Sequence, residues 1–178
     1  MTLFELLMEF QKVEISITYN LGKVKSVLAL QDQNITKPIF EAWGTIYRAA
    51  MQDRFNLFAR GGGTWEPLQE STVKRRRKGR KGSKQASASI LIDTGTLWAT
   101  LDPSIGAEGQ HQVIDSNSVT IGISGGMHPG GIELGELAAI HHFGTSRIPA
   151  RPILVEPDER TRQTMVQAME IGLQKGLE

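Results

Sequence analysis

Cysteine is absent from this sequence of 178 residues, and its absence excludes several kinds of chemistry. Without cysteine the chain has no disulfide framework, no cysteine-based zinc site and no thiol nucleophile. Long apolar runs are absent as well, since no window approaches the roughly 18 uncharged residues that a membrane span requires. The apolar opening Met1–Met8 contains Glu5 and has no basic region, which is not typical of a secretory signal. We therefore expect a soluble chain that does not enter a membrane and fits a reducing cytoplasm.

Positive charge is concentrated in one short stretch. The chain has 20 Lys and Arg against 19 Asp and Glu, a net charge of +1. Eight of the basic residues and no acidic one lie between positions 74 and 84, namely Lys74, Arg75, Arg76, Arg77, Lys78, Arg80, Lys81 and Lys84. The remainder has 12 basic and 19 acidic residues, a net charge of −7. Neighbouring glycine and serine predict a flexible basic loop over residues 74–89. This loop is either solvated without a partner or contacts DNA or another polyanion without reading its sequence.

The length fits a single domain over residues 1–178. Alternation of apolar and polar residues over 13–19 predicts a half-buried strand. Residues 1–10 form a short helix, extend that strand, or act as an arm that grips a neighbouring subunit. A helix is expected over 21–31, and a break over 34–38 should precede the longest helix, which starts near Pro38 and ends before three glycines at 61–63.

The second half of the chain predicts a hairpin between helices. Asp93 or Thr94 is expected to cap a short helix through Leu101. Residues 110–114 and 118–123 read as two strands of a hairpin. Helices follow over 132–143 and over 158–177, and Val166, Met169, Ile171 and Leu173 give the last one an apolar side. The order predicts an α+β fold, in which a small, mainly antiparallel sheet packs against the long helix and the C-terminal helix.

No catalytic or metal-binding pattern withstands inspection. Residues 122–126 match G-x-S-x-G around Ser124, but no helix is expected directly after the serine and no histidine lies beyond His142, as an esterase-type triad would require. The adjacent His141 and His142 lack the spacing of a helical zinc site. We expect no enzyme activity, no cofactor and no metal. One of these rings should pack inward, and the other should cap the helix end as a partly cationic group.

The segment from Ala138 to Pro152 carries the densest backbone signals. A helix end runs into Gly144, the residue suited to a left-handed helix stop. Pro149 and Pro152 then fix two φ angles and favour an extended path. We interpret this segment as the scaffold of an assembly surface, with Arg151 held within or between subunits, away from solvent, and paired to a carboxylate or to helix-end carbonyls. The basic loop is expected to be a separate site.

An ordered series of short motifs spans the chain. The motifs are Arg54-Phe55, then Trp65-x-Pro67-Leu68 followed by Thr72 and Lys74, then Ile90-Leu91-x-x-Thr94-Gly95-x-Leu97, then His141-His142-Phe143-Gly144, and last Ile148-Pro149-Ala150-Arg151-Pro152. In this series the chain resembles the virion morphogenesis or tail completion proteins of Mu-like and related tailed phages. It departs from them in having Ile153-Leu154-Val155 after the last proline, and in its long basic stretch.

The resemblance implies a structural virion protein of the neck or tail end. Such proteins form homo-oligomeric rings, commonly of six subunits, that complete the tail and join it to the head around the DNA channel. The implied partners are the tail tube or terminator, the head connector and the genomic DNA, with no membrane. The implied location is the virion, and the host cytoplasm during assembly. The alternative is a small non-specific nucleic-acid-binding protein that acts through the basic loop.

Overall fold

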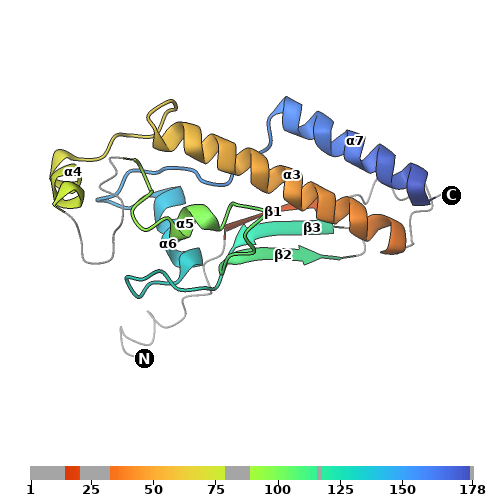
Figure 1. The fold of residues 1–178 in the computed structure, drawn as a ribbon, viewed down its shortest axis with the longest axis horizontal. Helices are drawn as coiled ribbons and strands as arrows, with labels where there is room; N and C mark the ends of the chain where they lie inside the picture. Colours follow the sequence, from red (N-terminus) through yellow and green to blue (C-terminus); the bar gives the residue numbers. More distant parts are fainter. Residues whose placement is uncertain (1–14, 21–32, 79–88, 116–117, 177–178) are drawn as a thin grey trace.

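The computed structural model describes residues 15–20, 33–78, 89–115 and 118–176 (Figure 1). A small antiparallel sheet, one long helix and a C-terminal helix laid along it confirm the predicted α+β fold (Figure 1). The expectations for residues 1–10 and for a helix over 21–31 lie outside the described residues, as do Arg80, Lys81 and Lys84.

The sheet has three strands in the order β1-β3-β2, and both strand pairs are antiparallel. Strand β1 (Ile15–Asn20) pairs with β3 (Ser118–Ile123), which also pairs with β2 (Gln110–Ile114). The hairpin of β2 and β3 has the bounds that the sequence predicted. In the central strand β3, Val119, Ile121 and Ile123 are fully buried at alternate positions, as a strand with one core face requires.

Helix α3 (Gln33–Ala59) is the longest element, and it spans about 40 Å at 1.5 Å per residue. The prediction that it starts near Pro38 is wrong, because Pro38 lies inside the helix. Proline lacks the N–H that would bond the carbonyl four residues earlier, but this costs a single hydrogen bond near the helix start. Thr36 and Ile39 on either side are each only 1% exposed, so packing of the first turns offsets the loss.

Helix α3 carries the centre of the hydrophobic core. Its buried residues recur at helical spacing, and they are Ile39, Phe40, Trp43, Tyr47, Met51, Phe55 and Ala59. Helix α7 (Glu159–Gly176) lies along α3 and begins where Asp158 Oδ1 accepts the Thr161 N–H at 2.8 Å (Figure 1). The expectation of a helix over 158–177 therefore holds for the described residues. Of the four residues expected on its apolar side, Met169 and Leu173 pack against the core, whereas Val166 and Ile171 are exposed, so the expectation is wrong for these two.

Three short helices gather at one end of the molecule (Figure 1). They are α4 (Glu70–Arg77), α5 (Thr96–Ala99) and α6 (Leu134–Phe143). The N-cap of α5 is Gly95, not Asp93 or Thr94, although the Thr94 hydroxyl accepts the Thr96 N–H at 3.3 Å. Helix α6 ends at Gly144, as the sequence predicted, but its φ of 76° and ψ of 179° form an extended conformation reserved for glycine and not the left-handed helical one that was expected. None of the helices in the described residues is both long and apolar enough to cross a bilayer.

The expectation that the basic loop starts at Lys74 is wrong, since residues 70–77 form α4. Composition alone was misleading here, because Lys and Arg are good helix formers. Arg76 also fastens the helix to the chain that follows. Its Nη1 donates to the Ser89 carbonyl at 2.7 Å and to the Ile92 carbonyl at 3.2 Å, and its Nε lies 3.7 Å from Asp93 Oδ1.

Candidate functional site

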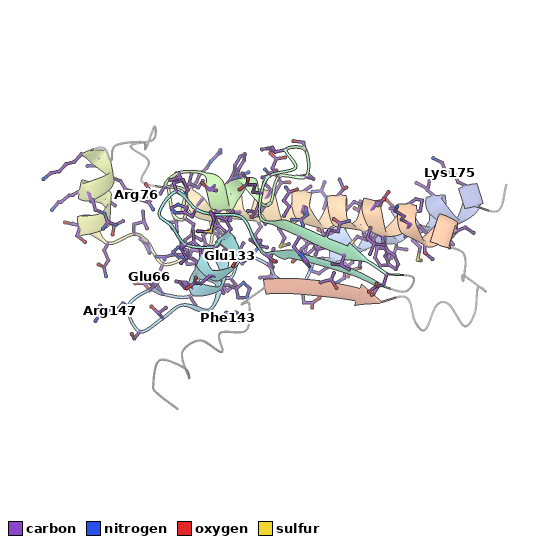
Figure 2. The ribbon with its side chains drawn as sticks, turned by 90° about the horizontal axis from the view of Figure 1, so that it is seen from below. Glu66, Arg76, Glu133, Phe143, Arg147 and Lys175 are labelled. Carbon is purple, nitrogen blue, oxygen red and sulfur yellow. The ribbon has the colours of Figure 1, made fainter. Side chains whose placement is uncertain are left out.

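A cleft of about 360 Å³ lies at the end of the molecule where α4, α5 and α6 meet. Five chain segments line it. They are the loop 66–69, helix α4, the stretch 91–97, helix α6 together with His128 of the loop before it, and the extended segment 147–151. In Figure 2 the labelled Glu66, Arg76 and Arg147 lie at this end of the molecule, and Lys175 of α7 lies at the other. We name this hollow the arginine cleft.

The arginine cleft brings together motif residues that are far apart in the sequence. Nine of the predicted assembly residues line it, and they are Pro67, Leu68, Thr94, Gly95, Leu97, His141, Ile148, Pro149 and Arg151. Two residues of the predicted basic loop, Arg75 and Arg76, line it as well. The expectation that the basic residues form a site separate from the segment 138–152 is therefore wrong for these two arginines.

The charges of the cleft are predominantly positive. Four arginines line it, Arg75, Arg76, Arg147 and Arg151, against the two carboxylates of Glu66 and Asp93. Arg76 and Arg151 are held by hydrogen bonds to backbone carbonyls. Arg75 and Arg147 are exposed, and neither forms an ion pair or side-chain hydrogen bond with a described residue. Two guanidinium groups are thus available to an anionic partner.

Arg151 joins the extended segment to the loop after α3. Its side chain is 5% exposed, and its Nη2 and Nε donate to the Glu66 carbonyl at 2.9 and 3.2 Å. Its own N–H donates to the His141 carbonyl at 2.7 Å, at the end of α6. The acceptor of the guanidinium is therefore a loop carbonyl, not the carboxylate or helix-end carbonyl that we expected. The expected position within the protein, away from solvent, is confirmed.

The pKa values of the two histidines at the end of α6 are both lowered. Burial lowers the pKa of His141 to about 4, assisted by the nearby positive charges of Arg151 and Arg76. Burial also lowers the pKa of His142, with a contribution from Arg54. His142 Nδ1 accepts the Ile153 N–H at 3.2 Å, whereas His141 Nδ1 is buried and has no hydrogen-bond partner among the described residues. His141 is therefore the ring that packs inward, as expected, and the lowered pKa of His142 is contrary to the expected partly cationic cap, because burial and the charge of Arg54 oppose protonation.

A third histidine, His128, lines the cleft and is linked by hydrogen bonds to the hydroxyl groups of two threonines. His128 Nδ1 accepts the Gly130 N–H at 3.0 Å, so in the neutral ring the proton is on Nε2. Nε2 lies 3.1 Å from Thr94 Oγ1, which lies 2.8 Å from Thr96 Oγ1. These contacts fix the loop after β3 against the start of α5.

The other motif residues support the cleft or lie outside it. Trp65 is 5% exposed and packs edge-on against Phe55 and Phe58, with ring centroids 5.1 and 5.4 Å apart. The Pro152 carbonyl accepts Arg54 Nη1 at 2.7 Å. Gly144 closes α6 directly over the backbone of residues 148–150, and Ala150 is exposed.

Phe143 is the most exposed large apolar residue of the described chain, at 68%, and lies at the same end of the molecule (Figure 2). Its ring contacts His142 edge-on at 4.6 Å. An exposed aromatic ring on an anchored helix end is suited to contact a partner.

The outer side of α4 carries the remaining described cations. Lys74, Arg77 and Lys78 are exposed, and none of them lines the arginine cleft. Lys74 Nζ pairs with Glu70 Oε2 at 3.2 Å, one helical turn away. Helix α4 has no buried residue and stands apart from the sheet (Figure 1), so its outer side is open to a large anionic partner.

The patterns weighed for catalysis and metals are not assembled in the described part of the chain. Residues 125–131 after Ser124 form turns and a single bridge to Glu133, so no helix begins at the serine as a nucleophile elbow requires. Among the described residues no three His, Asp or Glu side chains lie close enough to hold a metal ion.

Sequence reasoning missed several residues of the cleft. Arg147, Glu66 and Asp93 belong to no motif, and only the path of the chain brings them together. Leu91 belongs to a motif and also lines the cleft, but its backbone conformation was not expected: it is the one non-glycine residue with positive φ, 59°, in the described ranges. Its side chain is buried, which offsets the strain of that conformation. A leucine gives no sequence signal for such a conformation.

No protein-family model matches the chain, and comparisons with curated proteins and with solved structures likewise find no match.

Proposed function

We propose that this chain is a structural protein of the neck or tail end of a tailed phage. Copies of it form a ring, commonly of six subunits in such proteins, that completes the tail and joins it to the head around the DNA channel. The observation that carries this proposal is the convergence of nine scattered motif residues on one cleft. Seven of these nine residues are at least partly exposed, and Leu97 and Arg151 are buried, so most of the nine line a hollow that is open to a partner.

Two further features support an assembly role. Phe143, within one of the motifs, is exposed at the cleft end of the molecule, where it suits an interface. The exposed cations of α4 project from that same end, where in a ring they would be repeated once per subunit (Figure 1). Repetition multiplies weak contacts with a polyanion such as DNA.

Assembly of the purified chain tests the proposal directly. Light scattering and electron microscopy over a range of concentrations should show a closed ring, and Phe143→Asp should reduce its formation. Val166→Asp is the matched control, because Val166 is also an exposed apolar residue, at 46%, but lies on α7. A chain that stays monomeric at every concentration contradicts the proposal.

The position in the particle is tested in the phage itself. A strain that lacks this chain should accumulate separate heads and tails, and antibody labelling should mark the neck of complete particles. Replacing Lys74, Arg77 and Lys78, the exposed cations of α4 outside the arginine cleft, by serine should leave the ring intact but impair DNA retention or joining. Unaltered particle yield and infectivity in that variant would contradict a role for these cations at the DNA channel.

A second candidate function, a free nucleic-acid-binding protein, is favoured by the cations of α4. The exposed Lys74, Arg75, Arg77 and Lys78 predict a salt dependence of about −3 to −4 in log affinity per log salt, at about −0.9 per phosphate contact. The two candidates differ in what the monomer does. If the monomer binds DNA as tightly per subunit as any assembled form, the second candidate is favoured over the ring.

A further inference from the structure

We propose that the arginine cleft is a carboxylate-binding site whose ligand is the segment Glu156–Glu159 of a second copy of this chain. Subunits would then join head to tail, with the cleft of one holding the acidic segment of the next. This inference rests on the ring proposed above and deepens it, because it names the two surfaces that meet.

The cleft offers two unpaired guanidinium groups on a fixed frame. Arg75 and Arg147 are exposed at its edge without an ion pair to any described residue. Behind them Arg76 and Arg151 are anchored to carbonyls and add to the positive potential. Guanidinium groups bind carboxylates through two parallel hydrogen bonds, which gives geometric specificity. A hollow of about 360 Å³ has room for a few such side chains.

The segment Glu156–Glu159 offers the densest group of carboxylates in the described chain. Glu156, Asp158 and Glu159 are all exposed, three acids within four residues. Asp158 caps α7, and Glu159 Oε1 accepts Gln163 Nε2 at 3.1 Å. Glu156 has no side-chain partner among the described residues. The segment itself is fixed, because the Tyr47 hydroxyl donates to the Val155 carbonyl at 2.9 Å and Pro157 is buried.

The two surfaces cannot meet within one chain. The arginine cleft lies at the end of the molecule formed by α4 and α6, whereas α7 begins against the middle of α3 (Figure 1). Both are held by hydrogen bonds to the body of the protein. Contact between two different patches on identical subunits is heterologous, and repetition of such a contact closes a ring or extends a filament.

DNA fits the cleft less well than carboxylates do. The backbone of a duplex is convex, so it suits cations that project, such as Arg77 and Lys78 on the outer side of α4. A second copy can supply negative charge to the positive cleft, because the chain outside residues 74–84 has a net charge of −7. The cleft is therefore assigned to the neighbouring subunit, and the outer side of α4 remains for the polyanion.

A charge exchange between two full-length variants tests the assignment. The cleft variant is Arg75→Glu with Arg147→Glu, and the segment variant is Glu156→Arg with Glu159→Arg. Each alone should weaken self-association at least about tenfold, because like charges then face each other across the contact. An equimolar mixture should restore association, since each variant then meets its opposite. Sedimentation velocity provides the measurement, and circular dichroism with urea unfolding verifies that each variant is folded.

A third variant supplies the matched control. Arg77→Glu with Lys78→Glu reverses the same number of charges outside the cleft, so it should assemble like the wild type and lose DNA affinity instead. The assignment is overturned if the folded cleft variant assembles normally, if the mixture fails to restore assembly, or if the cleft variant loses only DNA binding. In each of these results the wild-type ring still forms, so the proposed function stands. A wild type that never assembles contradicts both.

Discussion

Replacing Arg151 by methionine should loosen the frame of the arginine cleft without abolishing the fold. The guanidinium fixes the extended segment after α6 to the loop after α3, through hydrogen bonds of 2.9 and 3.2 Å to the carbonyl of Glu66. Methionine retains an apolar stem of similar length but donates no hydrogen bond. The Arg151→Met substitution therefore isolates the contribution of the charged head from that of the packed stem.

The expected loss of stability is about 2 kcal/mol. A hydrogen bond from a charged donor contributes roughly 1.5–3 kcal/mol, and the second bond adds little because both end on one oxygen. Removal of the donor leaves the Glu66 carbonyl without this partner. Relief from burying a charge, which already lowers the pKa of Arg151, offsets part of the loss.

Urea unfolding followed by tryptophan fluorescence measures this change. With a slope of about 2 kcal/mol per molar urea, the midpoint should fall by roughly 1 M. Arg147→Met is the control, since Arg147 is exposed and unpaired, and its midpoint should stay within about 0.3 M of the wild type. Equal midpoints for Arg151→Met and wild type, or equal losses in the two variants, would refute the view that Arg151 anchors this end of the molecule.

Three other predictions concern a histidine and two glycines. The pKa of His141 in the folded protein is about 4, below its ordinary value of 6.5. The neutral ring therefore stabilises the fold above pH 6.5, and this contribution of about 2–3 kcal/mol is lost as the pH falls towards 4. His141→Gln should flatten this part of the curve of unfolding free energy against pH, and an unchanged slope would contradict the assignment. Gly144→Ala places a Cβ 2.7 Å from a backbone nitrogen, at a φ and ψ reserved for glycine, so the free energy of unfolding should fall by about 2–4 kcal/mol. Gly61→Ala is the control, because Gly61 has open space around it, and its loss should be about 1 kcal/mol. Gly172→Ala places a Cβ 2.5 Å from Ile39 Cγ1. The free energy of unfolding should therefore fall by about 1–2 kcal/mol, although alanine has the better helix propensity. A gain in melting temperature would contradict this and would show that α3 and α7 can move apart.

Local patterns in the sequence predicted the fold well where one residue type decides the structure. The alternation in 110–114 and 118–123 gave the hairpin bounds, and Gly144 gave the helix stop. The predictions were wrong where tertiary contacts override a local signal. Pro38 lies inside α3 because the turns around it are buried, and that burial is not visible in the local sequence. The prediction for α4 was wrong for a different reason: its composition resembles a loop, but Lys and Arg are good helix formers.

The candidate site was predictable only in parts. The motifs identified most of its lining, and Arg151 was expected to be held away from solvent. The cleft itself depends on the meeting of five segments, so its shape and its unpaired arginines could not be deduced from spacing. Which of the two histidines packs inward could not be read from the sequence, because the burial of His141 beside Arg151 and Arg76 is a property of the folded chain.

Among the described residues, most long-range hydrogen bonds from side chains are donated to backbone carbonyl oxygens. Arg48 shows the pattern best: it is 4% exposed, and it donates to the carbonyls of Thr100 and His111 at 2.9 and 2.7 Å. Arg54, Tyr47 and Arg151 do the same at Pro152, Val155 and Glu66. Every amino acid supplies a carbonyl, so in evolution the acceptor positions are free to change identity as long as the chain keeps its path. The donors have no such freedom, and mutational drift should therefore spare these few side chains and the lengths of the loops they reach.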